Sequence, residues 1–407
     1  MKENTAYLPL EIYRREYLPK LILAITLAQR GIDVVIGSKP FVINLALKSK
    51  KPGIYFEKSS KADKGMRHID LLKKKRFKLI AQDEEAGITI SDMNKFDVDR
   101  GFKNIFYFDK FFCWGQRDFS YIKNRYDFKN VVRTGSPRTL TWGEIGKKYW
   151  SKEILMLKYN HSRYVLFVSN LSIKNGILPP EKAKLIQNEF GVPIYTEQDI
   201  EVFTSNEEKL FEKFIQVIEL VLQETKLNIV IVLHPTELRE KWDIFFKSQS
   251  RICIVSPKSI DPYVLSCDAV IASNSTVIYQ AIASGVPTYT LASLVELDKS
   301  PDLLPSTVAI KAKSTIELLA LLNAQTKNPD SSLEFIKDYL IDHVGSYNSV
   351  FEIANVMEDL LNNSNDAKFS VFKFRLISLV IRMEVLIKLV KSKIGFALQK
   401  RLQKVNK

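Results

Sequence analysis

Residues 6–37, AYLPLEIYRREYLPKLILAITLAQRGIDVVIG, decide the fold. The apolar segments at its two ends, 6–12 and 33–37, have the length and composition of strands, and the segment between them predicts a helix that ends at Gly31. This alternation continues along the chain, with strands expected at 53–57, 77–82, 110–115 and 130–135 and helices near 39–49, 64–76 and 117–126. Strands that alternate with helices predict a parallel sheet with helices on its faces.

A second series of the same kind starts at residue 163. Its apolar runs are RYVLFVSN (163–170), NIVIVLHP (228–235), ICIVS (252–256), DAVIASNS (268–275) and PTYTL (287–291), with helices expected at 206–225 and 275–284. Runs of this kind are typical of central strands buried on both faces. The sequence therefore predicts two α/β domains, 1–150 and 151–330, with a linker around 141–162. A helical crossover, 331–366, is expected to pack back on the first domain, and a basic segment, 367–407, follows it.

The composition is that of a globular protein, with 46% hydrophobic and 26% charged residues among 407. Cys113, Cys253 and Cys267 have no CxxC spacing, so the sequence favours neither a disulfide framework nor a zinc site and indicates a reducing cytoplasm. The first residues lack the apolar core of a signal peptide, and no apolar run reaches the roughly 18 residues of a membrane-spanning helix. No feature of the main body predicts nucleic-acid binding.

The basic charge is concentrated in the tail. Residues 368–407 contain eleven Lys or Arg and one acid, so they hold +10 of the net charge of +14. Their apolar residues recur every three to four positions and predict one helical stripe, formed by Phe372, Leu376, Leu379, Met383, Leu386, Leu389 and Val390. Such a helix lies in a membrane interface with its lysines against anionic headgroups; a helix packed on protein is the alternative. We expect a cytoplasmic protein bound peripherally at the inner face of the cytoplasmic membrane.

Polar residues follow several predicted strands, at the edge where parallel sheets bind their ligands. His234 and Pro235 end one strand, and because Pro stops strand pairing, His234 is expected at the sheet edge with Glu237 beside it. An imidazole there can donate to a phosphate oxygen or protonate a leaving phosphate. A histidine satisfied by a loop carbonyl is the structural alternative.

A run of small polar residues, Ser273, Asn274, Ser275 and Thr276, follows another strand at the start of a predicted helix. Their hydroxyls and the free backbone N–H groups predict a phosphate site, although simple capping would require just one of the four. Ser169 and Asn170 are expected to form a matching loop in the same domain. Neither a GxGxxG pattern nor a Walker motif occurs, so ordinary dinucleotide or ATP binding is not predicted.

Three carboxylates, Asp83, Glu84 and Glu85, stand side by side after the strand at 77–82. Crowded acids raise one another's pKa values, which can separate a base from an acid. Lys58, at the end of the strand at 53–57, is expected to neutralise this run or to bind an acidic sugar. A strand-end charge cluster without catalytic use is the structural alternative.

Taken in order, these motifs resemble those of bacterial surface carbohydrate biosynthesis proteins with a GT-B glycosyltransferase fold, especially the retaining β-Kdo transferases of glycosyltransferase family 99 and relatives. The likeness covers about residues 5–300. In the first domain it rests on residues 8–39, PGIYFEKS, DEEAG, WGQRD and TGSPR, and in the second on HPTE and SCDAVIASNSTVIYQAIASGVPTY. The resemblance implies two Rossmann-like domains facing a central cleft.

The resemblance also implies transfer of Kdo from CMP-Kdo onto a lipid-linked or growing surface glycan, without a metal or other cofactor. DEEAG is similar to an acidic catalytic motif, interrupted by Ala86, and HPTE and SNST look like motifs for the CMP phosphate. The residues that would bind the sugar carboxylate or the acceptor are Glu11, Arg15, Lys58 and Arg138.

Other activities on the same fold stay open. Polyol-phosphate transferases of teichoic-acid assembly use CDP-glycerol and need a base His in the first domain, where His68 is predicted on a basic helix, an unfavourable position. A UDP-sugar 2-epimerase would have no need of a membrane-seeking tail. A non-enzymatic scaffold would bind no nucleotide.

Overall fold

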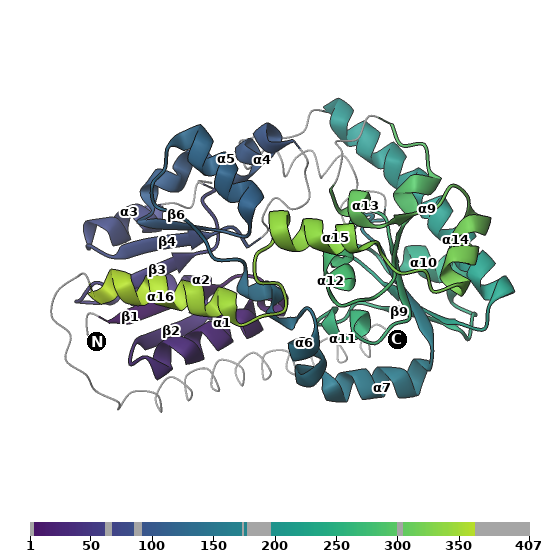
Figure 1. The fold of residues 1–407 in the computed structure, drawn as a ribbon, viewed down its shortest axis with the longest axis horizontal. Helices are drawn as coiled ribbons and strands as arrows, with labels where there is room; N and C mark the ends of the chain where they lie inside the picture. Colours follow the sequence, from purple (N-terminus) through teal and green to yellow (C-terminus); the bar gives the residue numbers. More distant parts are fainter. Residues whose placement is uncertain are drawn as a thin grey trace, which may run out of the picture.

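The computed structural model describes residues 4–61, 67–84, 92–172, 175–176, 197–298 and 304–362, and it forms two α/β domains side by side (Figure 1). The predictions for Glu85 and for the segment 367–407 lie outside the described residues. So does residue 86, which interrupts the acidic motif.

The first domain is built on a parallel sheet with the strand order β2-β1-β3-β4-β5-β6. Its strands are β1 Thr5–Leu10, β2 Asp33–Ser38, β3 Ile54–Glu57, β4 Lys78–Gln82, β5 Lys110–Cys113 and β6 Val131–Arg133. Its helices are α1 Tyr13–Gln29, α2 Lys39–Lys48, α3 Arg67–Lys74, α4 Met93–Arg100 and α5 Gln116–Tyr126, with the short turn η1 Phe102–Tyr107. The strand–helix alternation predicted for this half of the chain is confirmed.

The second domain contains a parallel sheet with the order β12-β11-β10-β7-β8-β9. Its strands are β7 Tyr164–Val168, β8 Asn228–Val232, β9 Ile252–Val255, β10 Ala269–Ala272, β11 Thr288–Thr290 and β12 Ile310–Lys311. Its helices are α9 Glu197–Glu224, α10 Glu240–Phe246, α11 Asp261–Val264, α12 Val277–Ala283, α13 Leu304–Val308 and α14 Thr315–Asn323, with the turn η3 Leu291–Leu294. β7 and β10 are buried along their whole length, as expected of central strands.

The segment around 141–162, expected to be a linker, is helical. α6 Glu144–Tyr149 and α7 Ser151–His161 follow the turn η2 Pro137–Thr141 and bridge the two domains along the lower margin of the molecule in Figure 1. The physical reason is local: α7 has an acid in its first turn and Lys158 and His161 in its last, which complements the helix dipole.

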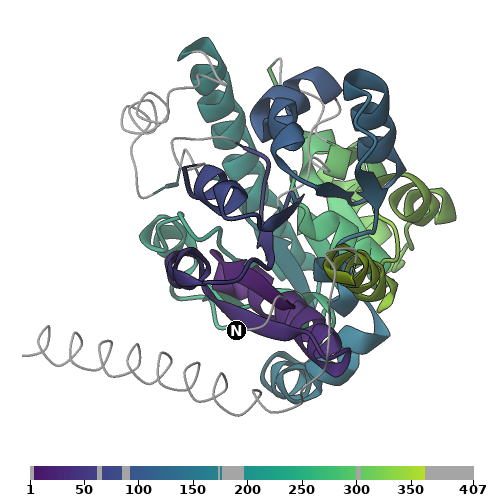
Figure 2. The same cartoon turned by 90° about the vertical axis from the view of Figure 1, so that its left-hand side faces the viewer.

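The chain then returns to the first domain. After α15 Asp330–Glu334 and the turn η4 Phe335–Leu340, α16 Asn348–Asn362 lies beside α1 (Figures 1 and 2). Ile353 and Met357 of α16 and Leu23 and Leu27 of α1 are fully buried in one apolar cluster. The crossover segment therefore completes the core of the domain in which the chain began.

The carboxyl ends of the sheets approach each other at the domain junction. α5 follows β5, α12 follows β10, and the charge of Arg117 on the first helix acts on Tyr279 of the second. None of the described helices is long and apolar enough to cross a membrane.

Candidate functional site

The strand orders place the candidate residues at two topological switch points. The order reverses between β1 and β3 in the first sheet and between β7 and β10 in the second. Parallel open sheets bind ligands at the carboxyl ends of the strands that flank such a point. Glu11 and Lys58 follow β1 and β3, whereas Ser169, Asn170 and residues 273–276 follow β7 and β10. Both domains therefore carry polar groups at the position where this architecture binds ligands.

Glu57 organises the first switch point. Its Oε1 accepts hydrogen bonds from Lys39 Nζ and from the backbone N–H of Lys58, both at 2.8 Å, and its Oε2 lies 2.7 Å from His68 Nε2. Burial alone would raise the pKa of Glu57, but the hydrogen bonds from His68 and Lys39 lower it to about 2. The carboxylate therefore stays ionised and orients the imidazole. Lys39 and Lys58 also approach Glu11 Oε2, at 3.6 and 2.9 Å.

This arrangement changes the interpretation of His68. The first turn of α3 brings His68 against Glu57 at the end of β3, with its side chain 13% exposed. A histidine on a basic helix gives no sequence signal of this kind, because its partner, 11 positions earlier, lies in a different element, at the end of β3. The structure thus provides a carboxylate–histidine pair in the first domain that the sequence did not predict.

Lys20 holds the acid run in place. Its Nζ lies 3.1 Å from Glu84 Oε1 and 3.8 Å from Glu16 Oε2, and it donates to the carbonyl of Pro9 at 2.8 Å. Glu16 Oε2 in turn accepts the backbone N–H of Glu11 at 2.8 Å. The side chains of Lys20 and Glu84 are only 4% and 10% exposed, so losing one partner would leave a buried charge unpaired. This ion pair connects the ends of β1 and β4.

Asp83 lies in a second buried charged group. Arg100 Nη1 is 3.8 Å from Asp83 Oδ1, and the backbone carbonyl of Asp83 accepts the indole N–H of Trp114 at 2.8 Å. Burial raises the pKa of nearby Asp118 to about 7, Arg117 lowers it, and the charge of Asp83 raises it again. When two acids share one buried environment, one can keep its proton while the other stays ionised.

The two described acids of the run are nearly buried. Asp83 and Glu84 follow β4, at the predicted sheet edge, but they are only 4% and 8% exposed. Lys58 lies beside the run, since its backbone carbonyl accepts the N–H of Glu84 at 3.0 Å, but its ammonium group pairs with Glu11 instead of neutralising the run. Among the described residues, Lys20 pairs with Glu84 and Arg100 approaches Asp83.

In the second domain, Glu237 connects two loops. Its Oε2 accepts hydrogen bonds from the hydroxyl of Ser169 (2.8 Å) and the indole N–H of Trp242 (3.1 Å). Its Oε1 accepts the backbone N–H groups of Leu171 (3.0 Å) and His234 (3.3 Å). Because the carboxylate and the Ser169 hydroxyl satisfy each other, these two residues position the loops after β7 and β8.

His234 is half-buried at the end of β8. Its Nδ1 lies 2.7 Å from Thr236 Oγ1, and the backbone N–H of Thr236 points at the same nitrogen at 3.4 Å. Burial lowers the pKa of His234, whereas Glu237 raises it. With Nδ1 accepting, the neutral ring carries its proton on Nε2, the tautomer that can donate to a phosphate oxygen. Pro235, beside it, is exposed.

The turn after β10 offers further polar groups. Ser273 is buried, Asn274, Ser275 and Thr276 are half-buried, and Ser275 Oγ accepts the N–H of Val277 at 3.3 Å. The Oδ1 of Asn274 is buried and has no hydrogen-bond partner within the described part of the chain. α12 has only 7 residues, so an anion here would depend on the hydroxyls and amides of the turn itself.

The two predicted arginines occupy different places. Arg15 is half-buried in the first turn of α1, close to the first switch point. Arg138 lies on η2, and its charge acts on Asp261, whose pKa is raised by burial. Asp261 accepts from Gln280 Nε2 at 2.6 Å and lies 3.5 Å from Thr141 Oγ1 of the first domain. Arg138 thus faces the domain junction.

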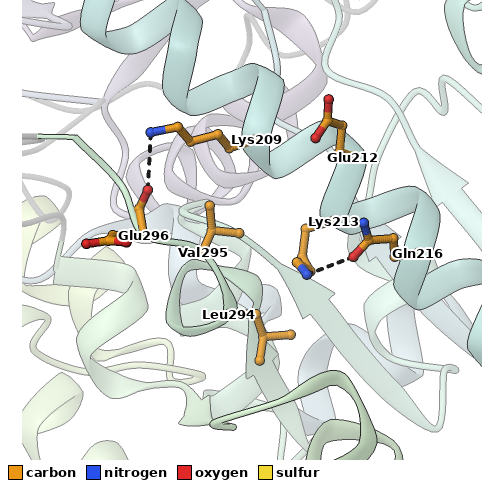
Figure 3. A pocket seen from close by; sticks show the side chains of 7 residues that line it. All are labelled: Lys209, Glu212, Lys213, Gln216, Leu294, Val295 and Glu296. Carbon is orange, nitrogen blue, oxygen red and sulfur yellow. Dashed lines mark hydrogen bonds between the residues drawn. The ribbon is translucent and has the colours of Figure 1, made fainter.

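A separate pocket of about 340 Å³ lies between α9 and the segment after η3 (Figure 3). Its lining residues are Lys209, Glu212, Lys213, Gln216, Leu294, Val295 and Glu296. Lys209 donates to the carbonyl of Glu296 at 3.3 Å and Lys213 to Gln216 at 2.7 Å. None of the predicted site residues lines it. Among the described residues, no group of three or more His, Cys, Asp or Glu could hold a metal ion.

Comparison with solved structures identifies the architecture. Staphylococcus aureus MnaA in complex with UDP superposes with a TM-score of 0.54 at 13% identity, covering 91% of this chain and 100% of that one. The wall teichoic acid polymerase TagF gives a TM-score of 0.55 at 10% identity, covering 90% and 91%. UDP-GlcNAc 2-epimerase from Methanocaldococcus jannaschii gives 0.53 at 13%, covering 87% and 99%.

The chain has a GT-B-like fold. The predicted fold class is thereby confirmed. No family model matches the sequence, and no curated protein matches it either. The neighbours reported above include a UDP-GlcNAc 2-epimerase and a wall teichoic acid polymerase, and the finer resemblance to Kdo transferases stays a prediction.

Proposed function

We propose that the protein is a glycosyltransferase that moves Kdo from CMP-Kdo to a lipid-linked or growing bacterial surface glycan. The observation that supports this proposal best is the convergence of polar groups at both switch points of a GT-B-like fold. In the proposal, Lys39 and Lys58 bind the carboxylate of the sugar. His234 and residues 273–276 bind the phosphate of the nucleotide.

The chemistry requires a carboxylate near the anomeric carbon, either as a base for the acceptor hydroxyl or as a nucleophile. The candidates remain Asp83, Glu84 and Glu85. Of these, Glu84 pairs with Lys20 at 3.1 Å, and Asp83 lies 3.8 Å from Arg100. No metal is required in this proposal, because the lysines supply positive charge and the neutral His234 supplies a hydrogen-bond donor.

A second candidate is transfer of a polyol phosphate from CDP-glycerol. The observation that favours it is the pair of His68 and ionised Glu57, 2.7 Å apart at the first switch point. A carboxylate that holds an imidazole in one orientation is the arrangement of a general base. The likeness of the fold to a wall teichoic acid polymerase is compatible with this candidate.

Nucleotide binding tests the proposal. CMP should raise the melting temperature by a few degrees when present well above its Kd, and His234→Ala should abolish the rise without changing the unliganded melting temperature. The matched control is His161→Ala, which replaces a histidine at the end of α7. An unchanged CMP shift in the His234 variant would remove His234 from the site.

Turnover assays then separate the candidates. Kdo transfer predicts product from CMP-Kdo that persists in His68→Gln, whereas polyol-phosphate transfer predicts product from CDP-glycerol that His68→Gln eliminates. A UDP-sugar 2-epimerase would instead respond to UDP and interconvert UDP-sugars without an acceptor. A protein stabilised by none of CMP, CDP and UDP would contradict all three activities.

A further inference from the structure

Helix α7 presents an apolar face that no described element covers. Leu155, Met156 and Tyr159 are 69%, 65% and 90% exposed. Of the residues in this helix, only Leu157 is buried. Single exposed apolar residues are ordinary on a protein surface, but three on one helix form a patch that requires an explanation.

The spacing places these three side chains together. At about 100° per residue, positions 155, 156 and 159 fall within about 100° of arc, on the side of the helix opposite Leu157. Lys152 lies within the same arc and is exposed. Its aliphatic stem can lie along an apolar surface while its ammonium group stays in water.

The patch continues onto neighbouring elements. Tyr149 of α6 and Tyr13 of α1 are 52% and 58% exposed, and Tyr13 stacks on Tyr17 with ring centroids 4.5 Å apart. Burial raises the pKa of Tyr149, and Tyr17 and Glu153 lie close enough to raise it further. Ile12, 38% exposed, precedes α1 directly after the end of β1. Exposed apolar side chains therefore also occur on α6 and at the start of α1.

The charge of this surface is positive. Around α6 and α7 the exposed basic side chains are Lys147, Lys148, Lys152, Lys158 and Arg163, against the exposed acids Glu144 and Glu153. Glu144 is paired with Lys147 at 2.7 Å and Arg163 with Asp268 at 3.0 Å. The excess positive charge therefore comes from Lys148, Lys152 and Lys158 against Glu153. We define the α7 patch as Tyr13, Tyr149, Leu155, Met156 and Tyr159 with these basic residues.

We propose that the α7 patch binds an anionic lipid surface. Apolar side chains that enter the interface, tyrosines at headgroup level and lysines facing anionic headgroups are the features of interfacial membrane binding. A protein partner fits less well, because the cores of protein interfaces are depleted in lysine. In Figure 1, α7 lies along the lower margin of the molecule. This proposal does not depend on which donor the enzyme uses.

The experiment uses the full chain and vesicles of phosphatidylglycerol and phosphatidylcholine, compared with phosphatidylcholine alone. The triple variant Leu155→Ser/Met156→Ser/Tyr159→Ser should partition at least tenfold less onto the anionic vesicles. The control, Ile244→Ser/Ile316→Ser, removes two side chains that are 76% and 75% exposed on the second domain, and it should partition like the wild type. Lys148→Glu/Lys152→Glu should weaken binding most at low salt.

Equal partitioning of the triple variant and the control would overturn the proposal. A triple variant that changes the oligomeric state in light scattering but binds vesicles normally would also overturn it, in favour of self-association. The rise in melting temperature on adding CMP should be the same in the triple variant and the wild type. Failure of the lipid proposal is therefore distinguishable from failure of the proposed enzymatic function.

Discussion

Asp118 combines deep burial with a nearby like charge. Burial raises its pKa to about 7, with Arg117 and Arg100 lowering it and Asp83 raising it. In the unfolded chain an aspartate titrates near about 3.9, so between these values the native state binds the extra proton. The contribution of this group to stability is fully present below the unfolded pKa and is lost as the pH rises through 7.

Asp118→Asn should therefore flatten the pH dependence of stability. The wild type should lose stability relative to the variant between about pH 4 and pH 8, because only the wild type must ionise a buried carboxyl. Melting temperatures measured for both proteins across this range give the difference directly, with other titrating groups cancelling. Parallel curves would show that Asp118 does not titrate there.

For the acid run, residues 83–85, we predict an effect on turnover. Asp83→Asn or Glu84→Gln should lower the rate by about a hundredfold, the usual scale for losing a positioned acid or base, while the CMP shift persists. The exposed Glu144→Gln serves as the control and should keep the wild-type rate. If every replacement across 83–85 leaves turnover near normal, the run is structural, with Lys20 and Arg100 as its partners.

Among the elements, the return segment depends on one glycine. Gly135 has φ +67°, and a Cβ there would lie 2.3 Å from the carbonyl oxygen of Asp342 and 3.3 Å from Ser349 Cβ. Arg133, two residues before it, forms a two-pronged ion pair with Asp342 at 2.6 and 2.8 Å. The end of β6 thus holds the segment between η4 and α16 against the first domain.

Gly135→Ala should lower the free energy of unfolding by more than the backbone strain of an alanine at positive φ accounts for. Gly285 has φ +75°, and the Cβ that an alanine would add there meets no atom within 4 Å, so Gly285→Ala isolates the strain, about 1–2 kcal/mol. Gly135→Ala should exceed it by at least about 1 kcal/mol, since the backbone of the return segment must move. Denaturant unfolding of both variants measures the difference, and equal losses would mean that the contact is not tight.

Some features of the fold depend on short runs of sequence, and others depend on contacts between elements. The apolar strands and the polar residues after them were predictable because strand burial and strand ends depend on short runs of sequence. Helices α6 and α7 were missed because so few of their residues are buried. Lys20, Arg100 and Asp118 gave no sequence signal, since each lies in a helix and interacts with an acid after β4 that only the fold brings near. Which of these residues lie at a topological switch point could be told only from the strand order in the structure.

Across the whole molecule, the two domains and the crossover form a body with little net charge. The tail, 368–407, holds +10 of +14, so the other 367 residues carry only +4. At roughly 1 kcal/mol per basic residue near an anionic surface, the tail would dominate the initial attraction to a membrane. The α7 patch, with its exposed apolar side chains, would set which side of the body faces the lipid.

Removing residues 368–407 should therefore separate recruitment from orientation. The truncated protein should lose most binding to anionic vesicles at low salt, where charge attraction is least screened, and should keep transfer to a short soluble acceptor. Turnover on a lipid-anchored acceptor in vesicles should fall in both the truncated protein and the Leu155→Ser/Met156→Ser/Tyr159→Ser variant, while the soluble acceptor is used normally by each. Vesicle binding that is equal with and without the tail would contradict recruitment by charge. Normal turnover of the triple variant on the anchored acceptor would contradict orientation by α7.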